Sequence, residues 1–180
     1  MIFASDLRDR HAGALLWQWG VPVFAVCAMT ILLLLADNVP LFLFLNRNLS
    51  ALDDLVWSHF TLLGDATVAL LLFLPFIGRR PEFVWQFVLA AVLASLVSHG
   101  LKELFSEARP PALLPEGSFH LIGQKLQRSS FPSGHTITAF TLAGLFCMQI
   151  LKGAARYAML VLAVLIGLWR IACGVHWPLD

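Results

Sequence analysis

A short polar break, Phe131-Pro132-Ser133-Gly134-His135, precedes an apolar run that continues to Leu151. Proline does not fit inside a helix and serine is a favoured N-cap, so a helix is predicted to begin here with His135 in its first turn. Gly134 lets the backbone approach a ligand closely. Because the free N–H groups of a helix N-terminus suit phosphate, the break is a candidate phosphate-binding site.

Two cations precede this break, Lys102 and Arg109, and Pro110 follows the second one directly. They are seven residues apart, or two helical turns. Both therefore fall on one helix face if the preceding apolar helix continues past Leu101 until Pro110 stops it. Such a pair can bind phosphate oxygens, although basic side chains that snorkel to a membrane interface show the same pattern.

A third group, Arg170, His176 and Asp180, ends the sequence. Arg170 lies inside the end of an apolar helix, where a permanent charge is costly and usually faces the bundle or a ligand. Pro178 suits the first position of a new helix, which would place Asp180 in its first turn, near His176. A carboxylate there can accept the imidazole N–H and fix the tautomer.

The composition indicates an integral membrane protein. Of 180 residues, 59% are hydrophobic and 13% are charged, and the mean hydropathy is +0.80, which no soluble domain of this size would tolerate. A net charge of +1 gives no reason to expect a nucleic-acid partner. Cys27, Cys147 and Cys173 lie far apart in apolar runs, so neither a disulfide framework nor a zinc site is predicted.

These chemical groups require helices to position them. A hydrocarbon core about 30 Å thick needs ~20 apolar residues per helix. Leucines and a valine recur at helical spacing from Leu41 to Val56, which predicts an amphipathic helix on the membrane surface. The predicted fold is therefore all-α, a single multi-span helix bundle over residues 1–180, with spans at 14–36, 57–77, 83–101, 134–151 and 157–175.

The short connections predict the orientation of the bundle. Basic residues occur near the N-terminus and in the connections 78–82 and 152–156, which by the positive-inside rule are cytoplasmic. The long 102–133 loop and the end of the last helix then face outward. Tryptophans are expected at the two interfaces, with Trp17, Trp19 and Trp85 at the inner one and Trp57, Trp169 and Trp177 at the outer one.

The three groups in this order resemble the type 2 phosphatidic acid phosphatase superfamily of lipid phosphate phosphatases and haloperoxidases, in its bacterial membrane branch. The quoted residues are Lys102-x6-Arg109-Pro110, Pro132-Ser133-Gly134-His135 and Arg170-x5-His176-x3-Asp180. Residues 1–101 resemble the family in topology only. Trp169 stands where members often carry serine. Members also have a sixth membrane helix after this aspartate, so the resemblance implies a domain that is truncated at its C-terminus, or a catalytic carboxylate at a frayed end.

The resemblance also implies a mechanism without metal or cofactor. His176 would attack phosphorus and form a phosphohistidine, Asp180 would orient it, and His135 would protonate the leaving oxygen. Cations and a helix N-terminus can stabilise the phosphoryl group without a metal. The residues implied to bind the phosphate are Lys102, Arg109, Ser133, Gly134 and Arg170.

The implied activity is hydrolysis of a lipid phosphate monoester or diphosphate at the outer face of the inner membrane, with undecaprenyl diphosphate favoured. Phosphatidylglycerophosphate, lipid A phosphate and transfer to a second lipid are alternatives. A non-enzymatic scaffold or transporter is disfavoured because His135 and His176 are both present, and a haloperoxidase is disfavoured by the membrane spans. The expected partners are the bilayer and a lipid substrate, and the sequence leaves the oligomeric state open.

The remaining ionisable residues in or beside the spans, His59, Asp65 and His99, are expected to pack or to form hydrogen bonds between helices. The outward loop carries three further polar groups that are equally consistent with a substrate head group and with solvent: His120, Lys125 and Arg128.

Overall fold

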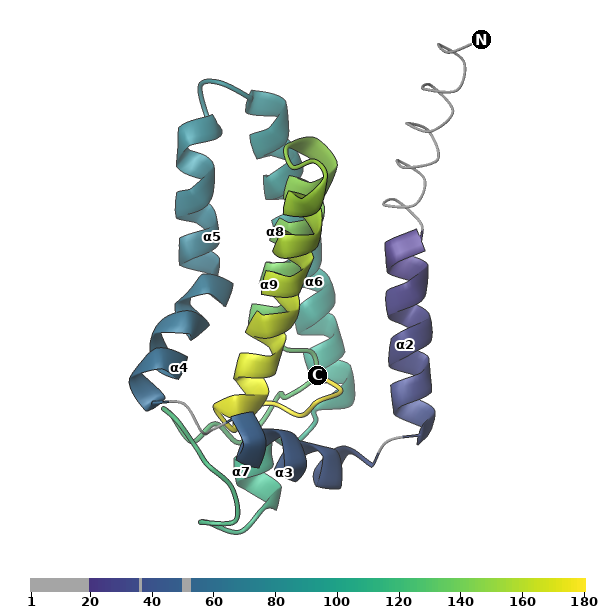
Figure 1. Ribbon diagram of the computed structural model, residues 1–180, viewed down its shortest axis with the longest axis vertical. Coiled ribbons are helices and arrows are strands. Elements are labelled where there is room, and N and C mark those ends of the chain that lie inside the picture. The colour runs from purple at the N-terminus through teal and green to yellow at the C-terminus, as the bar shows by residue number, and fades with distance from the viewer. Residues whose placement is uncertain (1–19, 36, 50–52) are drawn as a thin grey trace. The chain divides into compact units, whose positions relative to one another are not determined.

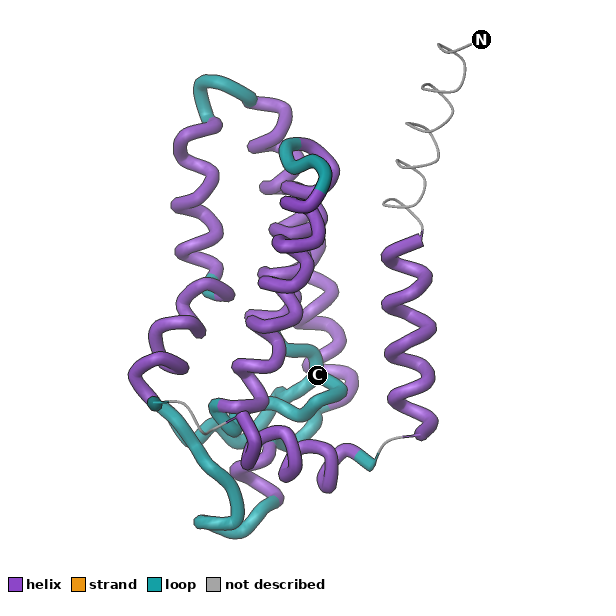
Figure 2. The backbone as a smooth tube through the Cα atoms, viewed as in Figure 1, coloured by secondary structure: helices purple, strands orange, loops and turns teal. Residues whose placement is uncertain are grey.

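The computed structural model describes residues 20–35, 37–49 and 53–180 (Figure 1). Within these residues every regular element is a helix and no strand occurs (Figure 2). The predicted all-α class is confirmed. The chain divides into two units, 1–37 and 38–180, which are described separately.

The first unit contains α2 (Val21–Leu35), which falls within the first predicted span. Its apolar side chains are largely exposed, as at Phe24 and Val26. The rest of that span, residues 14–19 and 36, lies outside the described residues. The same holds for the N-terminal basic residues and for Trp17 and Trp19.

In the second unit, α8 (Gly134–Gln149) packs against both α6 (Pro81–Phe105) and α9 (Ala154–Ala172). Figure 1 shows these three helices running alongside one another. A broken helix precedes α6 in the chain. It consists of α4 (Asp54–Thr61), η2 (Leu62–Gly64), α5 (Ala66–Phe73) and η3 (Leu74–Phe76).

The break in this helix falls at Gly64 and Asp65, inside the predicted 57–77 span. The Asp65 carboxylate accepts a hydrogen bond from the N–H of Thr67 at 2.7 Å and so starts α5 as an N-cap. The two halves meet at a bend of 56°. Two segments in the described residues, Pro81–Leu113 and Ala154–Ala172, are long and apolar enough to cross a membrane, and the bent pair would make a third. The predicted count of five spans is not confirmed.

The bundle is held by aromatic packing at one end and by a mixed core at the other. Phe73 stacks on Phe87 with ring centroids 3.8 Å apart. The rings of Phe83 and Phe146 pack against that of Phe73 and against each other. The second core is centred on Trp169, whose ring meets that of Trp57 edge to face at 6.1 Å.

The predicted outer tryptophan belt is therefore wrong. Trp57, Trp169 and Trp177 are buried, because their rings fill gaps between helices instead of facing the interface. Trp85 is exposed, as an interface residue would be.

The predicted amphipathic helix is two helices. The first, α3 (Asn38–Leu49), ends well before Val56. Asp53 then caps α4 by accepting a hydrogen bond from the N–H of Leu55 at 2.7 Å. The buried face of α3 consists of Phe42 and Asn46, one position after the leucines that the sequence pattern favoured.

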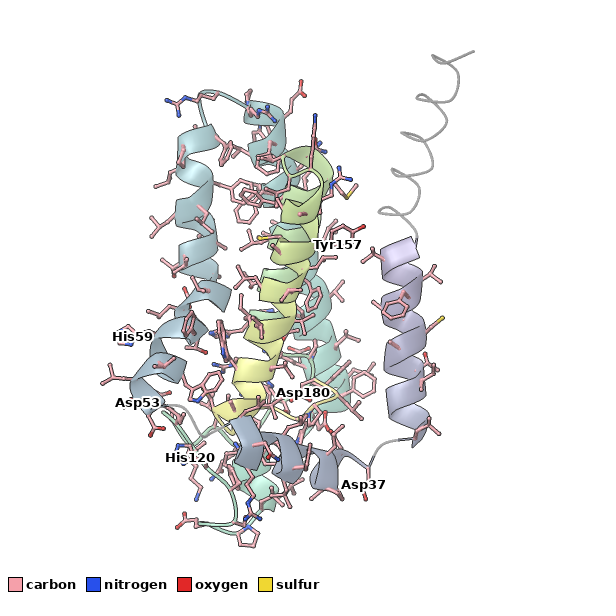
Figure 3. All side chains as sticks on the ribbon, in the orientation of Figure 1. Asp37, Asp53, His59, His120, Tyr157 and Asp180 are labelled. Atoms are coloured by element: carbon pink, nitrogen blue, oxygen red, sulfur yellow. The ribbon has the colours of Figure 1, made fainter. Side chains whose placement is uncertain are left out.

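The site and the short basic connections lie at opposite ends of this unit (Figure 1). One end carries the α5–α6 and α8–α9 connections. The other carries α3, α7 (Pro110–Leu113), the 114–133 loop and the segment after α9. Figure 3 shows His120 and Asp180 at this second end, with Tyr157 further along α9 toward the first.

Candidate active site

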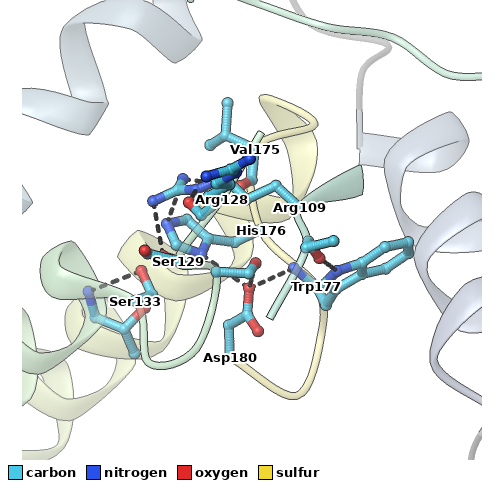
Figure 4. A network of polar contacts seen from close by, with 11 residues as sticks. Arg109, Arg128, Ser129, Ser133, Val175, His176, Trp177 and Asp180 are labelled. Atoms are coloured by element: carbon cyan, nitrogen blue, oxygen red, sulfur yellow. Dashed lines mark hydrogen bonds and ion pairs between the residues drawn. The ribbon is translucent and has the colours of Figure 1, made fainter. Parts of the chain in front are cut away.

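His176 lies in the turn that follows α9, and only 3% of its surface is exposed. Its Nδ1 is 2.8 Å from Oδ2 of Asp180, and its Nε2 is 3.1 Å from Nη1 of Arg109 (Figure 4). Gly174 makes this turn possible because its φ is +75°. A Cβ at Gly174 would also come within 2.4 Å of the His120 carbonyl oxygen.

These two contacts determine the tautomer of His176. A guanidinium can only donate, so Nε2 must be the acceptor and carries the lone pair. Nδ1 then carries the proton and donates a hydrogen bond to Asp180. The nitrogen that carries no proton is therefore Nε2, which accepts from Arg109 and can act as a nucleophile when a substrate replaces that contact.

Burial lowers the pKa of His176 to about 4. The hydrogen bond to Asp180 raises this pKa, but the loss of solvation outweighs it, and the positive charge of Arg109 lowers it further. The ring is consequently neutral at physiological pH, and Nε2 carries a lone pair and no proton.

Asp180 is held in a turn in the described chain. Its own N–H donates to the Trp177 carbonyl at 3.1 Å, and its Oδ2 accepts from the Trp177 N–H at 2.8 Å. The Ser130 hydroxyl also donates to Oδ2. The Asp180 carbonyl accepts from the Ser133 N–H at 3.1 Å, which ties the turn to the start of α8.

Arg109 does not share a helix face with Lys102, so that part of the prediction is wrong. The helix α6 ends at Phe105, where Ser106 adopts left-handed backbone geometry, and Arg109 is extended. Its guanidinium is buried, and backbone carbonyls hold it in place. The partners are the carbonyls of Arg128 at 2.9 Å, Ser129 at 3.2 Å and Val175 at 3.0 Å (Figure 4).

The start of α8 matches the prediction. The Ser133 side chain accepts from the N–H of Thr136 and is the N-cap, and His135 lies in the first turn. Among the described residues, no neighbouring atom lies within 4 Å of where a Cβ on Gly134 would be. The backbone here thus leaves open space for a bound group.

Three predicted residues, Lys102, Gly134 and His135, line a hollow of about 390 Å³ between α5, α6 and α8. We call it the α5–α6–α8 hollow. His135 lies close to Gly64 at the edge of this hollow. A Cβ added at Gly64 would lie 3.0 Å from the Cβ of His135 and 3.2 Å from its Cδ2. The structure therefore places a second histidine and a lysine beside an open space.

Arg170 lies in the last turn of α9, and its Nη1 donates to the Thr61 hydroxyl at 2.8 Å. Its buried Nε has no hydrogen-bond partner in the described chain. Its positive charge acts on both His135 and His176. A buried guanidinium with an unused donor can bind a phosphate oxygen.

Several further residues, which the sequence motifs do not include, shape this site. Ser130 contacts Asp180, Thr61 holds Arg170, and Gly64 seats His135. Only Gly64 left a signal, because a Gly-Asp pair inside an apolar run marks a helix break. Ser130 and Thr61 are ordinary residues whose partners are distant in sequence.

The ionisable residues outside the three motifs have mostly local partners. His59 and His99 are exposed and bond to carbonyls of their own helices, at Leu55 and Ser95, so the predicted packing or bonding between helices is wrong for these two. In the 114–133 loop, His120 bonds to Asp54 at 2.7 Å and Lys125 pairs with Glu116. The Arg128 carbonyl holds Arg109.

Several known proteins are similar to this chain. The chain is 35% identical to a structure of LpxE from Aquifex aeolicus, with a TM-score of 0.70 over 81% of this chain and 86% of that one. It is 37% identical to "Bacitracin transport permease protein BcrC" of Bacillus licheniformis over 52% of this chain and 44% of the relative. It is 32% identical to "Putative undecaprenyl-diphosphatase YbjG" of Escherichia coli over 63% of this chain and 55% of that relative.

The chain thus spans about half the length of these two curated relatives. Residues 83–180, more than half of the chain, match the PAP2 superfamily. This segment contains all three motifs, and it confirms the family that they predicted. The protein is a member of the PAP2 superfamily.

Proposed function

We propose that this chain is a metal-independent phosphatase that hydrolyses a phosphate monoester or diphosphate of a membrane lipid through a phosphohistidine on His176. One observation carries the proposal. A buried, neutral imidazole has Nδ1 tied to a carboxylate at 2.8 Å, and its Nε2 faces a guanidinium at 3.1 Å. An oriented nucleophile beside a phosphate-binding cation is what phosphoryl transfer needs.

In the first step, Nε2 of His176 attacks the terminal phosphorus while its bond to the leaving oxygen breaks, which is the lipid oxygen in a monoester and the oxygen between the two phosphates in a diphosphate. The leaving oxygen takes a proton from His135, and Asp180 stabilises the positive charge that develops on the imidazole. Lys102, Arg109 and Arg170 bind the non-bridging oxygens. The Ser133–Gly134 backbone at the start of α8 assists them.

In the second step, water attacks phosphorus and gives a proton to His135. The N–P bond breaks, and inorganic phosphate leaves with both histidines restored. A second lipid in place of water would make the same protein a phosphotransferase.

The favoured substrate is undecaprenyl diphosphate, handled at the outer face of the inner membrane. The YbjG name and the basic connections at the end opposite the site support this choice. Phosphatidylglycerophosphate and lipid A phosphate are the alternatives. Phosphate released from a panel of these lipids by purified protein would rank them.

The histidine roles are tested by two variants and two classes of substrate. His176→Ala should abolish turnover of every substrate, because no nucleophile remains. His135→Ala should lower the turnover of an alkyl phosphate more than that of an aryl phosphate, because a phenolate leaves without much protonation. His59→Ala, which removes an exposed histidine bonded to its own helix, is the matched control.

The proposal also predicts a trapped intermediate and an insensitivity to chelators. Phosphate should be found on His176 after rapid quenching of wild-type protein. Vanadate should inhibit as a transition-state mimic, and activity should survive excess chelator. Equal loss on both substrates in His135→Ala, with no phosphohistidine formed, would refute the assigned roles.

A further inference from the structure

The end of α4 packs against the last turn of α9. Thr61 is the last residue of α4, and η2 begins at Leu62. The ring of Phe60 stacks on that of Trp169 with the two centroids 4.3 Å apart. Because Trp169 directly precedes Arg170, this aromatic contact places Thr61 beside the Arg170 guanidinium.

The hydroxyl of Thr61 bonds to a side chain that is distant in the sequence. Threonine side chains at helix ends commonly bond to backbone groups nearby. Within the described chain, the Thr61 side chain makes no capping hydrogen bond to η2. Its oxygen instead accepts from Nη1 of Arg170 at 2.8 Å, and the two residues are 109 positions apart. The hydroxyl therefore holds a motif side chain that belongs to another helix.

The contact with Thr61 leaves one edge of the Arg170 guanidinium open. The guanidinium is a planar fork, and Nε and Nη2 share one edge of it. Nε is buried and has no hydrogen-bond partner in the described chain. Among the described residues, the bond from Nη1 to Thr61 is the one hydrogen bond that this side chain makes. The charge of Arg170 acts on both His135 and His176, so the open edge belongs to a group near both histidines.

The other motif arginine, Arg109, uses its donors differently. Its Nη1 donates to the Val175 carbonyl and to Nε2 of His176, and its Nε and Nη2 donate to two carbonyls of the 114–133 loop. Four of the five N–H groups of a guanidinium are thus bonded within the protein. Arg109 can supply charge to a phosphate, but the edge that fits two phosphate oxygens belongs to Arg170.

We propose that Thr61 is a positioning residue, which turns Arg170 so that its Nε–Nη2 edge binds two oxygens of the transferred phosphoryl group. This inference rests on the proposed function and adds a residue that lies outside the three motifs. A long arginine side chain has many rotamers, and bidentate binding needs one of them. Holding Nη1 at a fixed hydroxyl selects that rotamer before the substrate arrives, which lowers the entropy cost of binding.

The first test compares Thr61→Val with the conservative variant Thr61→Ser, using vanadate inhibition of aryl phosphate hydrolysis. Valine has nearly the shape of threonine but no acceptor, so Thr61→Val should weaken vanadate inhibition by about tenfold. Thr61→Ser keeps the hydroxyl and should restore the wild-type inhibition constant. Ser58→Ala is the matched control, because the exposed Ser58 hydroxyl bonds to the Leu55 carbonyl of its own helix. Wild-type inhibition in Thr61→Val, or equally weak inhibition in Thr61→Ser, would overturn the inference.

The second test uses wild-type protein, so it does not depend on the folding of a Thr61 variant. Nitrogen-15 NMR in detergent follows the arginine Nε–H signals as vanadate is added, and Arg170→Lys identifies the signal of Arg170. This signal should shift on vanadate binding. The Nε–H signal of Arg109, which already donates to the Arg128 carbonyl, should shift less.

The two signals separate this inference from the proposed function. An Arg170 Nε–H signal that does not move while vanadate inhibits would overturn the bidentate binding. A response of Arg170 to vanadate in wild-type protein that hydrolyses no phosphate ester would instead refute the proposed function.

Discussion

At the scale of single residues, burial and two hydrogen bonds set the protonation state of His176, the proposed nucleophile. The carboxylate of Asp180 favours the protonated ring, whereas desolvation and Arg109 favour the neutral ring. Desolvation dominates, and the pKa falls to about 4. The proposed attack therefore needs no prior loss of a proton from the ring.

This balance predicts that His176 stays neutral in the folded protein down to about pH 5. An ordinary histidine protonates near pH 6.5, so unfolded protein takes up a proton in the range where the folded protein does not. The stabilisation from the neutral ring is therefore complete above roughly pH 6.5 and is lost as pH falls toward 4. Nitrogen-15 NMR of labelled histidines would follow the ring directly, with His176→Gln identifying its signal.

Asp180→Asn provides the control for this titration. It removes the carboxylate that raises the pKa of His176, so the midpoint should move further down. A His176 midpoint near 6.5 in the folded wild-type protein would contradict the account.

At the scale of elements, the break between η2 and α5 positions His135. A Cβ at Gly64 would lie 2.8 Å from Cγ2 of Ile166 and 3.0 Å from Cβ of His135. Both neighbours belong to packed helices, so neither can move freely. The glycine lets α9 and the start of α8 approach the broken helix.

Gly64→Ala is therefore expected to destabilise the fold by about 1–3 kcal/mol, as overpacked cores do. It should also lower alkyl phosphate turnover, because His135 is displaced. Denaturant unfolding in detergent and steady-state kinetics measure the two effects. Gly144→Ala in α8 is the control, since no neighbour lies within 4 Å of its Cβ position among the described residues. Equal stability of the two variants would refute the close packing.

A second element-scale contact joins α3 to the end of α9. The Asn46 side chain donates to the carbonyls of Ile171 and Ala172, each at 3.0 Å, and to that of His120 at 2.9 Å. Its oxygen accepts from the His120 N–H at 2.8 Å. One amide thus satisfies the last carbonyls of α9 and ties the loop beside them.

Asn46→Leu should cost about 1–3 kcal/mol in unfolding free energy for each polar group left without a partner. The exposed Asn48, which bonds to its own helix at Phe44, is the matched site for Asn48→Leu. That variant should change stability little. Thermal unfolding in detergent compares the two, and the Asn46 contact is refuted if both variants unfold at the same temperature.

At the scale of the whole molecule, the site and the short basic connections occupy opposite ends of the second unit. Because the positive-inside rule places the basic connections in the cytoplasm, the site is predicted to face outward. An outward site would act on lipid phosphates of the outer leaflet.

Cysteine labelling in intact cells tests this orientation. In a background that lacks the exposed Cys27, Ala112→Cys in α7 should react with a membrane-impermeant thiol reagent. Ala154→Cys, at the start of α9, should react only after the membrane is opened. The reverse pattern would place the site in the cytoplasm.

The sequence by itself determined those features that depend on local chemistry. Ser133 caps α8 because a hydroxyl after proline suits a helix start, and apolar runs form helices because backbone groups must be satisfied internally. The order of the three motifs was enough to identify the family. Their placement at one end also followed, since alternating helices return to the same side.

Only the tertiary structure decided how the motif residues meet. Arg109 reaches Nε2 of His176 because α6 ends at a left-handed Ser106. The carbonyls that hold the guanidinium belong to Arg128, Ser129 and Val175, which lie 19 to 66 positions further along the chain. Trp177 is buried because Phe42 of α3 packs against it, with the two ring centroids 5.1 Å apart. No local pattern encodes these contacts, because each joins residues that are far apart in the sequence.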